Sequence, residues 1–105
     1  MPNAKRGEVW QVDFGIAAKV RPALVMGSDI ADEDRVLVAL VYHTTALRGS
    51  HYEAPMRVPG LEAGGFDAQS LYTIPAAKLL RRRAVLTPAQ LAQVETKVKL
   101  WLGLD

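Results

Sequence analysis

Short apolar or alternating runs, each bounded by turn-forming residues, follow one another over the first 75 positions. Runs of this length and spacing are typical of strands. The run 35–45 is the most apolar and is rich in valine, which favours a central strand. The predicted strands cover residues 9–14, 20–26, 35–45, 51–58 and 70–74.

The segments between these runs carry the residues that interrupt strands. Residues 15–19 form a short loop, 30–34 are an acidic helical turn or surface loop, and 48–50 form a turn. Pro55 places its strand at an edge or a bulge, since proline donates no ladder hydrogen bond. Residues 59–65 contain too much proline and glycine to hold regular structure for long.

The last part of the chain predicts a helix. Residues 87–90, Thr-Pro-Ala-Gln, have the pattern of a capping box with proline at the first helical position, and Gly103 is a stop signal. One helical face is apolar, and we expect it to pack on the core. That face carries Leu91, Val94, Val98, Trp101 and Leu102. About five strands followed by a helix predict an α+β, mainly β fold: a small antiparallel barrel.

Length and composition narrow the class of protein. A chain of 105 residues is long enough for one domain, residues 1–105, with one modest core. The absence of cysteine excludes disulfides, thiolate metal sites and cysteine nucleophiles, and it fits a cytoplasmic protein. No apolar run approaches the roughly 20 residues of a membrane span, and residues 1–6 lead into no signal-like segment. We therefore expect a soluble, unexported protein without a membrane partner.

The formal charge of +2 is unevenly distributed. Residues 1–50 carry six basic and six acidic groups, whereas residues 51–105 carry seven and five. The run 81–83 consists of three arginines and holds most of the excess. Such a run is compatible with a phosphate-rich partner, although it is more often a solvated loop.

An arginine stands at the mouth of the second predicted strand. Arg21 precedes Pro22 and an apolar run, so its guanidinium lies where a buried strand begins. A rigid fork of N–H donors suits a phosphate or a carboxylate ligand. The alternative is a surface ion pair with a nearby acid such as Asp13.

Several motifs together, in their order and spacing, resemble the MazF/PemK toxins of bacterial toxin-antitoxin systems. The similarity runs from about Arg6 to Leu102, and its strongest parts are the first and third motifs. The motifs are Arg6-Gly7-Glu8-Val9-Trp10, Val12-Asp13-Phe14, Arg21-Pro22-Ala23-Leu24-Val25, His43-Thr44-Thr45 and Leu71-Tyr72-Thr73-Ile74. The resemblance implies a homodimer of SH3-like barrels, and sequence-selective cleavage of single-stranded RNA without metal or other cofactor. It also implies neutralisation by an acidic, MazE-like antitoxin that wraps the toxin surface and covers its basic groups.

By position, the family's active-site arginine falls on Arg21 and its active-site threonine on Thr44. When the 2′-hydroxyl of RNA attacks its own phosphate, negative charge develops on the nonbridging oxygens, and a preorganised cation with a hydroxyl donor lowers that barrier. Arg21 would clamp the phosphate and Thr44 would donate to it. Arginine keeps its proton up to about pH 12, so its first role is electrostatic, and donation of a proton to the leaving oxygen is a second role.

The sequence departs from the family at the proton acceptor. Many members have a longer loop with a glutamate between the first two strands, whereas here the loop 15–19 is short and contains no acidic residue. Some relatives also have an aspartate just before the Leu-Tyr-Thr-Ile equivalent, and here the neighbourhood 67–70 reads Asp-Ala-Gln-Ser, so that acid is shifted or absent. Imidazole titrates near neutral pH, which makes His43 and His51 candidate proton-transfer groups, with Asp13 as a minor one.

His43 and Thr44 are neighbours, and neighbouring side chains of a regular strand point to opposite faces. The two share a cleft only if the strand bulges or ends there; otherwise His43 is a structural or rim residue. Tyr72 and Trp10 could stack an RNA base, although core packing is the commoner role for such a tryptophan. The residues expected to bind RNA are Lys19, Thr45, Arg48, Tyr72, Arg81 and Arg82.

Two other functions stay open at this point. CcdB toxins share the barrel and bind DNA gyrase without chemistry, and a degenerate nucleic-acid-binding barrel would also lack the loop acid. Gyrase binding in that family uses a Trp-Gly-Ile-like terminus, which residues 101–105 echo only loosely, so we interpret Trp101 as a core residue at a helix end. No His/Asp/Glu cluster at ligand spacing supports metal-dependent cleavage.

Overall fold

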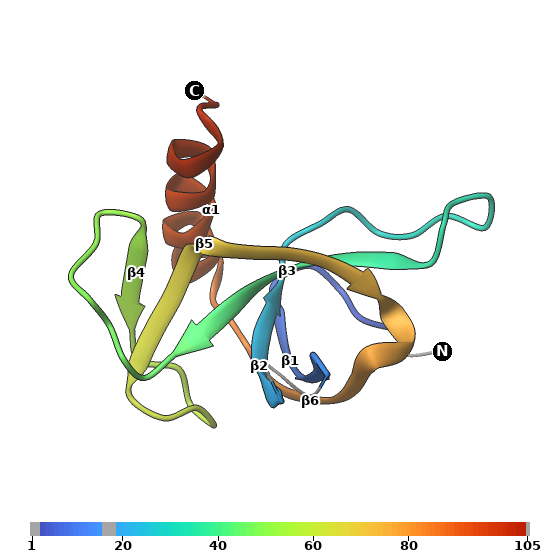
Figure 1. Ribbon diagram of the computed structural model, residues 1–105, viewed down its shortest axis with the longest axis horizontal. Helices are drawn as coiled ribbons and strands as arrows, with labels where there is room; N and C mark the ends of the chain where they lie inside the picture. Colours follow the sequence, from blue (N-terminus) through green and yellow to red (C-terminus); the bar gives the residue numbers. More distant parts are fainter. Residues whose placement is uncertain (1–2, 16–18, 105) are drawn as a thin grey trace.

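Six antiparallel strands form one strongly bent sheet, and a C-terminal helix packs against it (Figure 1). The computed structural model describes residues 3–15 and 19–104. The order of strands in the sheet is β4-β5-β3-β2-β1-β6. The elements are β1 (Glu8–Asp13), β2 (Val20–Val25), β3 (Leu37–Thr44), β4 (Glu53–Met56), β5 (Gly64–Pro75), a 3₁₀ turn (Ala76–Lys78), β6 (Leu79–Val85) and α1 (Pro88–Leu102).

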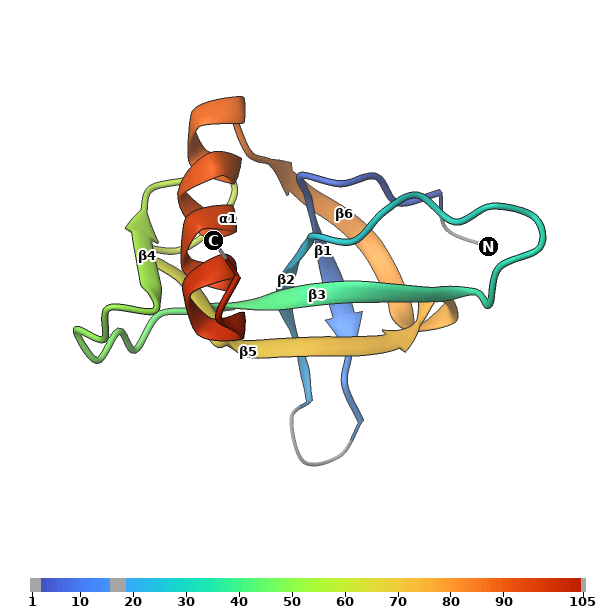
Figure 2. The same cartoon turned by 90° about the horizontal axis from the view of Figure 1, so that it is seen from above.

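The predicted mainly β fold with a terminal helix is confirmed. In the described residues β4 and β6 are not paired with each other, so the sheet forms an open barrel. Figure 2 shows β3 and β5 running side by side while the β1–β2 hairpin crosses them. The loop predicted at 15–19 falls largely on residues 16–18, which lie outside the described residues.

Strand β5 is much longer than the predicted strand 70–74 and begins inside the glycine-rich segment that was predicted to be irregular. Gly64 and Gly65 make this possible. A Cβ on Gly64 would overlap the Thr44 carbonyl oxygen, and one on Gly65 would meet the Ala54 carbonyl. Only glycine lets β5 pass between its neighbours β3 and β4 at this closeness.

The three arginines at 81–83 lie in β6, an additional edge strand that was not predicted. β6 pairs with β1 in a register that shifts twice. Long charged side chains are common on edge strands, because they keep other chains from adding to the sheet. The run is therefore a strand rather than the predicted solvated loop.

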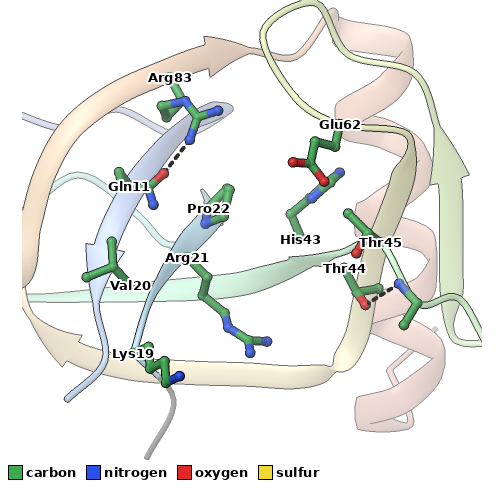
Figure 3. A pocket seen from close by; sticks show the side chains of 11 residues that line it. Gln11, Lys19, Val20, Arg21, Pro22, His43, Thr44, Thr45, Glu62 and Arg83 are labelled. Carbon is green, nitrogen blue, oxygen red and sulfur yellow. Dashed lines mark hydrogen bonds between the residues drawn. The ribbon is translucent and has the colours of Figure 1, made fainter. Parts of the chain in front are cut away.

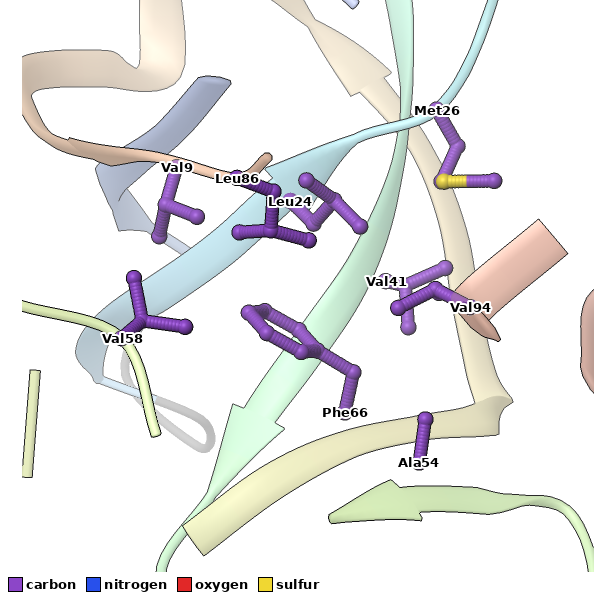
Figure 4. Packing of buried hydrophobic residues seen from close by; sticks show 9 residues of the cluster. All are labelled: Val9, Leu24, Met26, Val41, Ala54, Val58, Phe66, Leu86 and Val94. Carbon is purple, nitrogen blue, oxygen red and sulfur yellow. The ribbon is translucent and has the colours of Figure 1, made fainter. Parts of the chain in front are cut away.

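The core consists of two clusters, one on each face of β2 and β3. Phe66 is the largest fully buried side chain, and it lies in the cluster that α1 covers (Figure 4). Leu24 and Val41 belong to this cluster, whereas their neighbours Ala23 and Leu40 belong to the other. Because both faces of β2 and β3 are buried, the sequences of these two strands are continuous apolar runs.

Helix α1 begins with the predicted capping box. The Thr87 hydroxyl accepts from the backbone N–H of Gln90 at 3.1 Å, and Gly103 ends the helix in the left-handed region at φ 72°. The predicted core stripe is wrong at its C-terminal end: Trp101 and Leu102 are 43% and 50% exposed, because the last turn extends beyond β5 (Figure 1). No helix in the described part of the chain is long and apolar enough to cross a membrane.

Candidate active site

A cavity of about 670 Å³ opens where β2 begins and β3 ends (Figure 3). Five residues that the sequence singled out line it: Lys19, Arg21, His43, Thr44 and Thr45. A second cavity of about 150 Å³ adjoins it, and Arg21 and Thr44 line both. The two side chains that carry the predicted chemistry therefore lie at one place.

Arg21 is half-buried on β2, opposite Val12 of β1. Its guanidinium carbon lies 4.6 Å from the centre of the Tyr42 ring, an arrangement in which the aromatic face attracts the cation. The alternative ion pair with Asp13 is wrong: the Asp13 carboxylate accepts from the Gly15 N–H at 2.9 Å, and no ion pair joins it to Arg21 in the described residues. The Arg21 fork is thus held by a ring and keeps its donors for a ligand.

Thr44 is the last residue of β3. The β2–β3 register pairs Ala23 with Tyr42, and continuing it by two residues brings Arg21 opposite Thr44. The Thr44 hydroxyl oxygen accepts from the Ala46 N–H at 3.0 Å. With its oxygen fixed in this way, the hydroxyl keeps its proton for donation to a ligand.

His43 lies beside Thr44 and is only 5% exposed. The register between β3 and β5 shifts between Val41 and His43, so both His43 and Thr44 line the cavity, as required for a shared cleft. The imidazole packs edge-on against Phe66 with the ring centres 5.2 Å apart, and its Nε2 is buried without a hydrogen-bond partner among the residues that the structure describes. Burial lowers the pKa of His43, and the Glu62 carboxylate opposes this effect. The ring is therefore neutral at pH 7 and able to accept a proton.

The other two proton-transfer candidates lie elsewhere. His51 is exposed on the turn before β4, with its ring 4.1 Å from that of Tyr52, and lines neither cavity. Asp13 holds the turn after β1 and also lines neither. Of the three candidates, His43 alone is at the site.

The predicted basic residues divide between the two cavities and the outer surface. Lys19 lines the larger cavity and Arg48 the smaller one. Arg81 and Arg82 line neither, and Arg82 forms an ion pair with Glu8 at 3.0 Å. Arg83, which was not singled out, lines the larger cavity instead.

Tyr72 belongs to an aromatic group beside Arg21. It stacks on Tyr42 with the ring centres 4.6 Å apart and is 44% exposed, so one face is open to a flat ligand. Phe14 packs edge-on against Tyr42 at 4.3 Å. Trp10 is half-buried and donates its indole N–H to Glu8 at 3.0 Å, which makes it a structural residue.

Three carboxylates near the site were not among the predicted site residues, and one of them, Asp67, belongs to the 67–70 neighbourhood in which the sequence left an acid as shifted or absent. Glu62 lines the larger cavity, and Asp67 and Glu53 line the smaller one. Glu53 is buried and accepts from the backbone N–H groups of Arg48 and Ser50; the Arg48 bond is the largest of the effects that lower its pKa. Among residues 3–15 and 19–104, no three His, Asp or Glu side chains lie where they could hold a metal ion.

The model of the PemK-like, MazF-like toxins of type II toxin-antitoxin systems matches residues 5–102. The chain belongs to this MazF/PemK family. Solved structures with the same fold include an endoribonuclease in complex with its cognate antitoxin from a mycobacterial species, 24% identical over 97% of each chain with a TM-score of 0.84. MazE–MazF from Deinococcus radiodurans is 19% identical over the whole of both chains, with a TM-score of 0.83. Mycobacterium tuberculosis toxin MazF-mt6 is 23% identical over 93% of this chain and 98% of its own, with a TM-score of 0.79.

In this MazF/PemK chain, two residues that line the larger cavity, Arg83 and Glu62, were not predicted from the sequence. Simple alternation along a strand would place Arg81 and Arg83 on the same face, so Arg83 could be told from Arg81 only from the pairing of β6 with β1, whose register shifts between Val9 and Trp10 and leaves Arg83 without a partner residue on β1. Glu62 is a lone acid in a glycine-rich segment, and no local signal marks it.

Proposed function

We propose that this MazF/PemK chain is a sequence-selective endoribonuclease toxin, which cleaves single-stranded RNA in the cytoplasm without a metal ion and so inhibits translation and growth. The observation that carries the proposal is the common placement of Arg21 and Thr44 on the wall between two cavities. The scissile phosphate lies at this wall, with neighbouring nucleotides on either side.

Arg21 and Thr44 stabilise the reacting phosphate. As the 2′-oxygen attacks, charge develops on the nonbridging oxygens, and the guanidinium and the hydroxyl donate to them. Both groups are held in advance, Arg21 by the Tyr42 ring and Thr44 by the Ala46 N–H. They need little rearrangement during the reaction.

His43 accepts the proton. The 2′-oxygen bonds to phosphorus while its proton passes to the imidazole, the bond from phosphorus to the 5′-oxygen breaks, and that oxygen takes a proton from solvent. The products are a 2′,3′-cyclic phosphate and a 5′-hydroxyl end. A neutral imidazole beside Thr44 takes the place of the acid that the 15–19 loop lacks.

The proposed partners are a second copy of the chain and an acidic, MazE-like antitoxin. Solved structures of the same fold are described as complexes with cognate antitoxin or with MazE. An acidic segment is attracted to the same cations that bind RNA, among them Arg21, Lys19 and Arg48. The saturated complex is therefore expected to lack ribonuclease activity, and undiminished cleavage would contradict this part.

The test is cleavage of a defined transcript pool in EDTA by the purified protein, followed by mapping of fragment ends. We expect cuts at a fixed sequence, and their loss in Arg21→Ala. Arg35→Ala removes an exposed arginine outside both cavities and is the matched control. An intact pool, or equal cutting by the wild type and Arg21→Ala, would overturn the proposal.

One observation favours inhibition of gyrase as a second candidate function. Trp101 is exposed near the C-terminus, where it packs edge-on against Tyr52 at 5.3 Å rather than in the core. A supercoiling assay with gyrase distinguishes the two functions, since the ribonuclease leaves supercoiling unchanged.

A further inference from the structure

The end of the larger cavity away from Arg21 carries two opposite charges. Glu62 reaches it from the connection between β4 and β5, and Arg83 from β6 (Figure 3). No ion pair joins these two side chains within the described residues. Each side chain therefore has hydrogen-bonding groups that face the cavity and are available to a ligand. In a structural ion pair, those groups would bind each other instead.

Arg83 is held in place by the protein. Its guanidinium donates to the Gln11 side chain and to the Gly60 carbonyl at 3.0 Å. These bonds use two of its five N–H donors. The remaining donors belong to a fixed fork, which is suited to a ligand with two neighbouring acceptors.

His43 lies between this end of the cavity and Thr44 (Figure 3). The imidazole is nine-tenths buried, and its Nε2 has no hydrogen-bond partner in the described part of the chain. Glu62 and Arg83 are the charged groups that act on the ring, and Phe66 packs against its edge. A carboxylate, a guanidinium and an unpartnered imidazole thus line one cavity, about 670 Å³ in volume, which is of the size that small ligands occupy.

We propose that Glu62 and Arg83 form a guanine-binding subsite, and that the protein cleaves RNA on the 3′ side of guanosine. The proposal rests on the proposed ribonuclease function. An ionised carboxylate only accepts hydrogen bonds, so it selects a base edge with two adjacent donors. Guanine has such an edge in N1–H and its 2-amino group, whereas adenine, cytosine and uracil place acceptors beside their donors. A guanidinium only donates, and O6 and N7 of guanine are its usual acceptors.

The position of His43 fixes which nucleotide occupies the subsite. The phosphate lies at Arg21 and Thr44, and the attacking 2′-hydroxyl lies at the proton acceptor. His43 lies between the phosphate site and the subsite. The base in the subsite and the ribose with the attacking 2′-hydroxyl therefore belong to one nucleotide, the nucleotide on the 5′ side of the scissile phosphate. Cleavage then follows a guanosine.

The first experiment changes only the substrate. At a site mapped in the transcript pool, the nucleotide 5′ to the cut is replaced in a synthetic RNA by inosine, adenosine, cytidine or uridine, and cleavage rates are compared. We expect guanosine to be cut about tenfold faster than inosine, which lacks the 2-amino donor, and about a hundredfold faster than the others. Mapped cuts that follow other bases, or equal rates with guanosine and inosine, would overturn the subsite.

The second experiment changes the protein. Glu62→Gln keeps the size of the side chain but replaces one acceptor by a donor, so the ratio of guanosine to inosine rates is expected to fall to about one. Glu33→Gln, an exposed acid outside both cavities, is expected to leave the ratio unchanged. A merely structural role of Glu62 would lower both rates and preserve the ratio, and that result would refute the assignment.

A binding measurement separates failure of the subsite from failure of the proposed function. RNA with a 2′-O-methyl group at the attacking position cannot be cleaved, and its affinity is measured by fluorescence anisotropy. Tighter binding of the guanine version than the inosine version by the wild type, lost in Glu62→Gln, would support the subsite even in a protein that cuts nothing. Equal affinities would overturn it even in an active ribonuclease.

Discussion

Replacing Thr44 by valine separates chemistry from folding, because valine has almost the same shape and lacks only the hydroxyl. The lost donor is expected to slow cleavage about 100- to 1000-fold, or about 2.7–4 kcal/mol in the barrier. The cost in stability is much smaller. Ala46 is exposed, so water replaces the 3.0 Å bond that its N–H makes to Thr44, and the loss is about 1 kcal/mol or less. That corresponds to a fall in Tm of about 4–8 °C at most.

The assay is single-turnover cleavage of a defined transcript in EDTA, with thermal unfolding of the same samples. Thr44→Ser keeps a hydroxyl and is expected to retain activity within about tenfold, whereas Thr73→Val changes an exposed threonine of β5 that lines neither cavity and is expected to match the wild type. The reasoning fails if Thr44→Val is folded and cuts within about threefold of the wild type, since a donor to the reacting phosphate is worth far more than that.

Three further perturbations test the surroundings of the site. Because burial lowers the pKa of His43, cleavage should be constant near pH 7 and fall only below about pH 6.5 as the ring takes up a proton; a profile that is unchanged in His43→Gln would exclude it as the acceptor. Gly64→Ala should destabilise the fold by about 1–3 kcal/mol and reduce cleavage, since the added methyl displaces the Thr44 carbonyl; denaturant unfolding measures the first effect, and an unchanged midpoint would contradict the packing. Glu53→Gln should lower Tm at pH 7, because the carboxylate accepts the N–H groups of the 48–50 turn. The stabilisation by Glu53 is present above its unfolded pKa and lost as the pH falls through the lowered folded pKa, so the difference in Tm should shrink below pH 4.5, and a constant difference would refute the role.

The elements that could be predicted are those whose local pattern and tertiary environment agree. The strands β1, β2 and β3 are apolar because they are buried, and the capping box at Thr87 is a purely local signal. The placement of Arg21 and Thr44 could also be predicted, because family motifs mark these residues at the ends of two of these strands.

The rest depends on neighbours that the sequence does not reveal. Gly64 and Gly65 have the composition of a loop, yet they form a strand because two other strands approach their backbones closely. Trp101 has the periodicity of a core residue, yet it is 43% exposed and packs edge-on against Tyr52, because the sheet ends before the helix does. Glu62 enters the site only through the path of the chain from β4 to β5.

The shared wall of the two cavities has a consequence for how substitutions act. Arg21 and Thr44 each line both chambers, and the Arg21 guanidinium rests on the flat face of Tyr42. Groups bound in the two chambers therefore meet the same pair of side chains. A substitution at either position is expected to weaken binding upstream and downstream of the cut together, whereas one at Lys19 or Arg48, which each line one chamber, acts on one side alone.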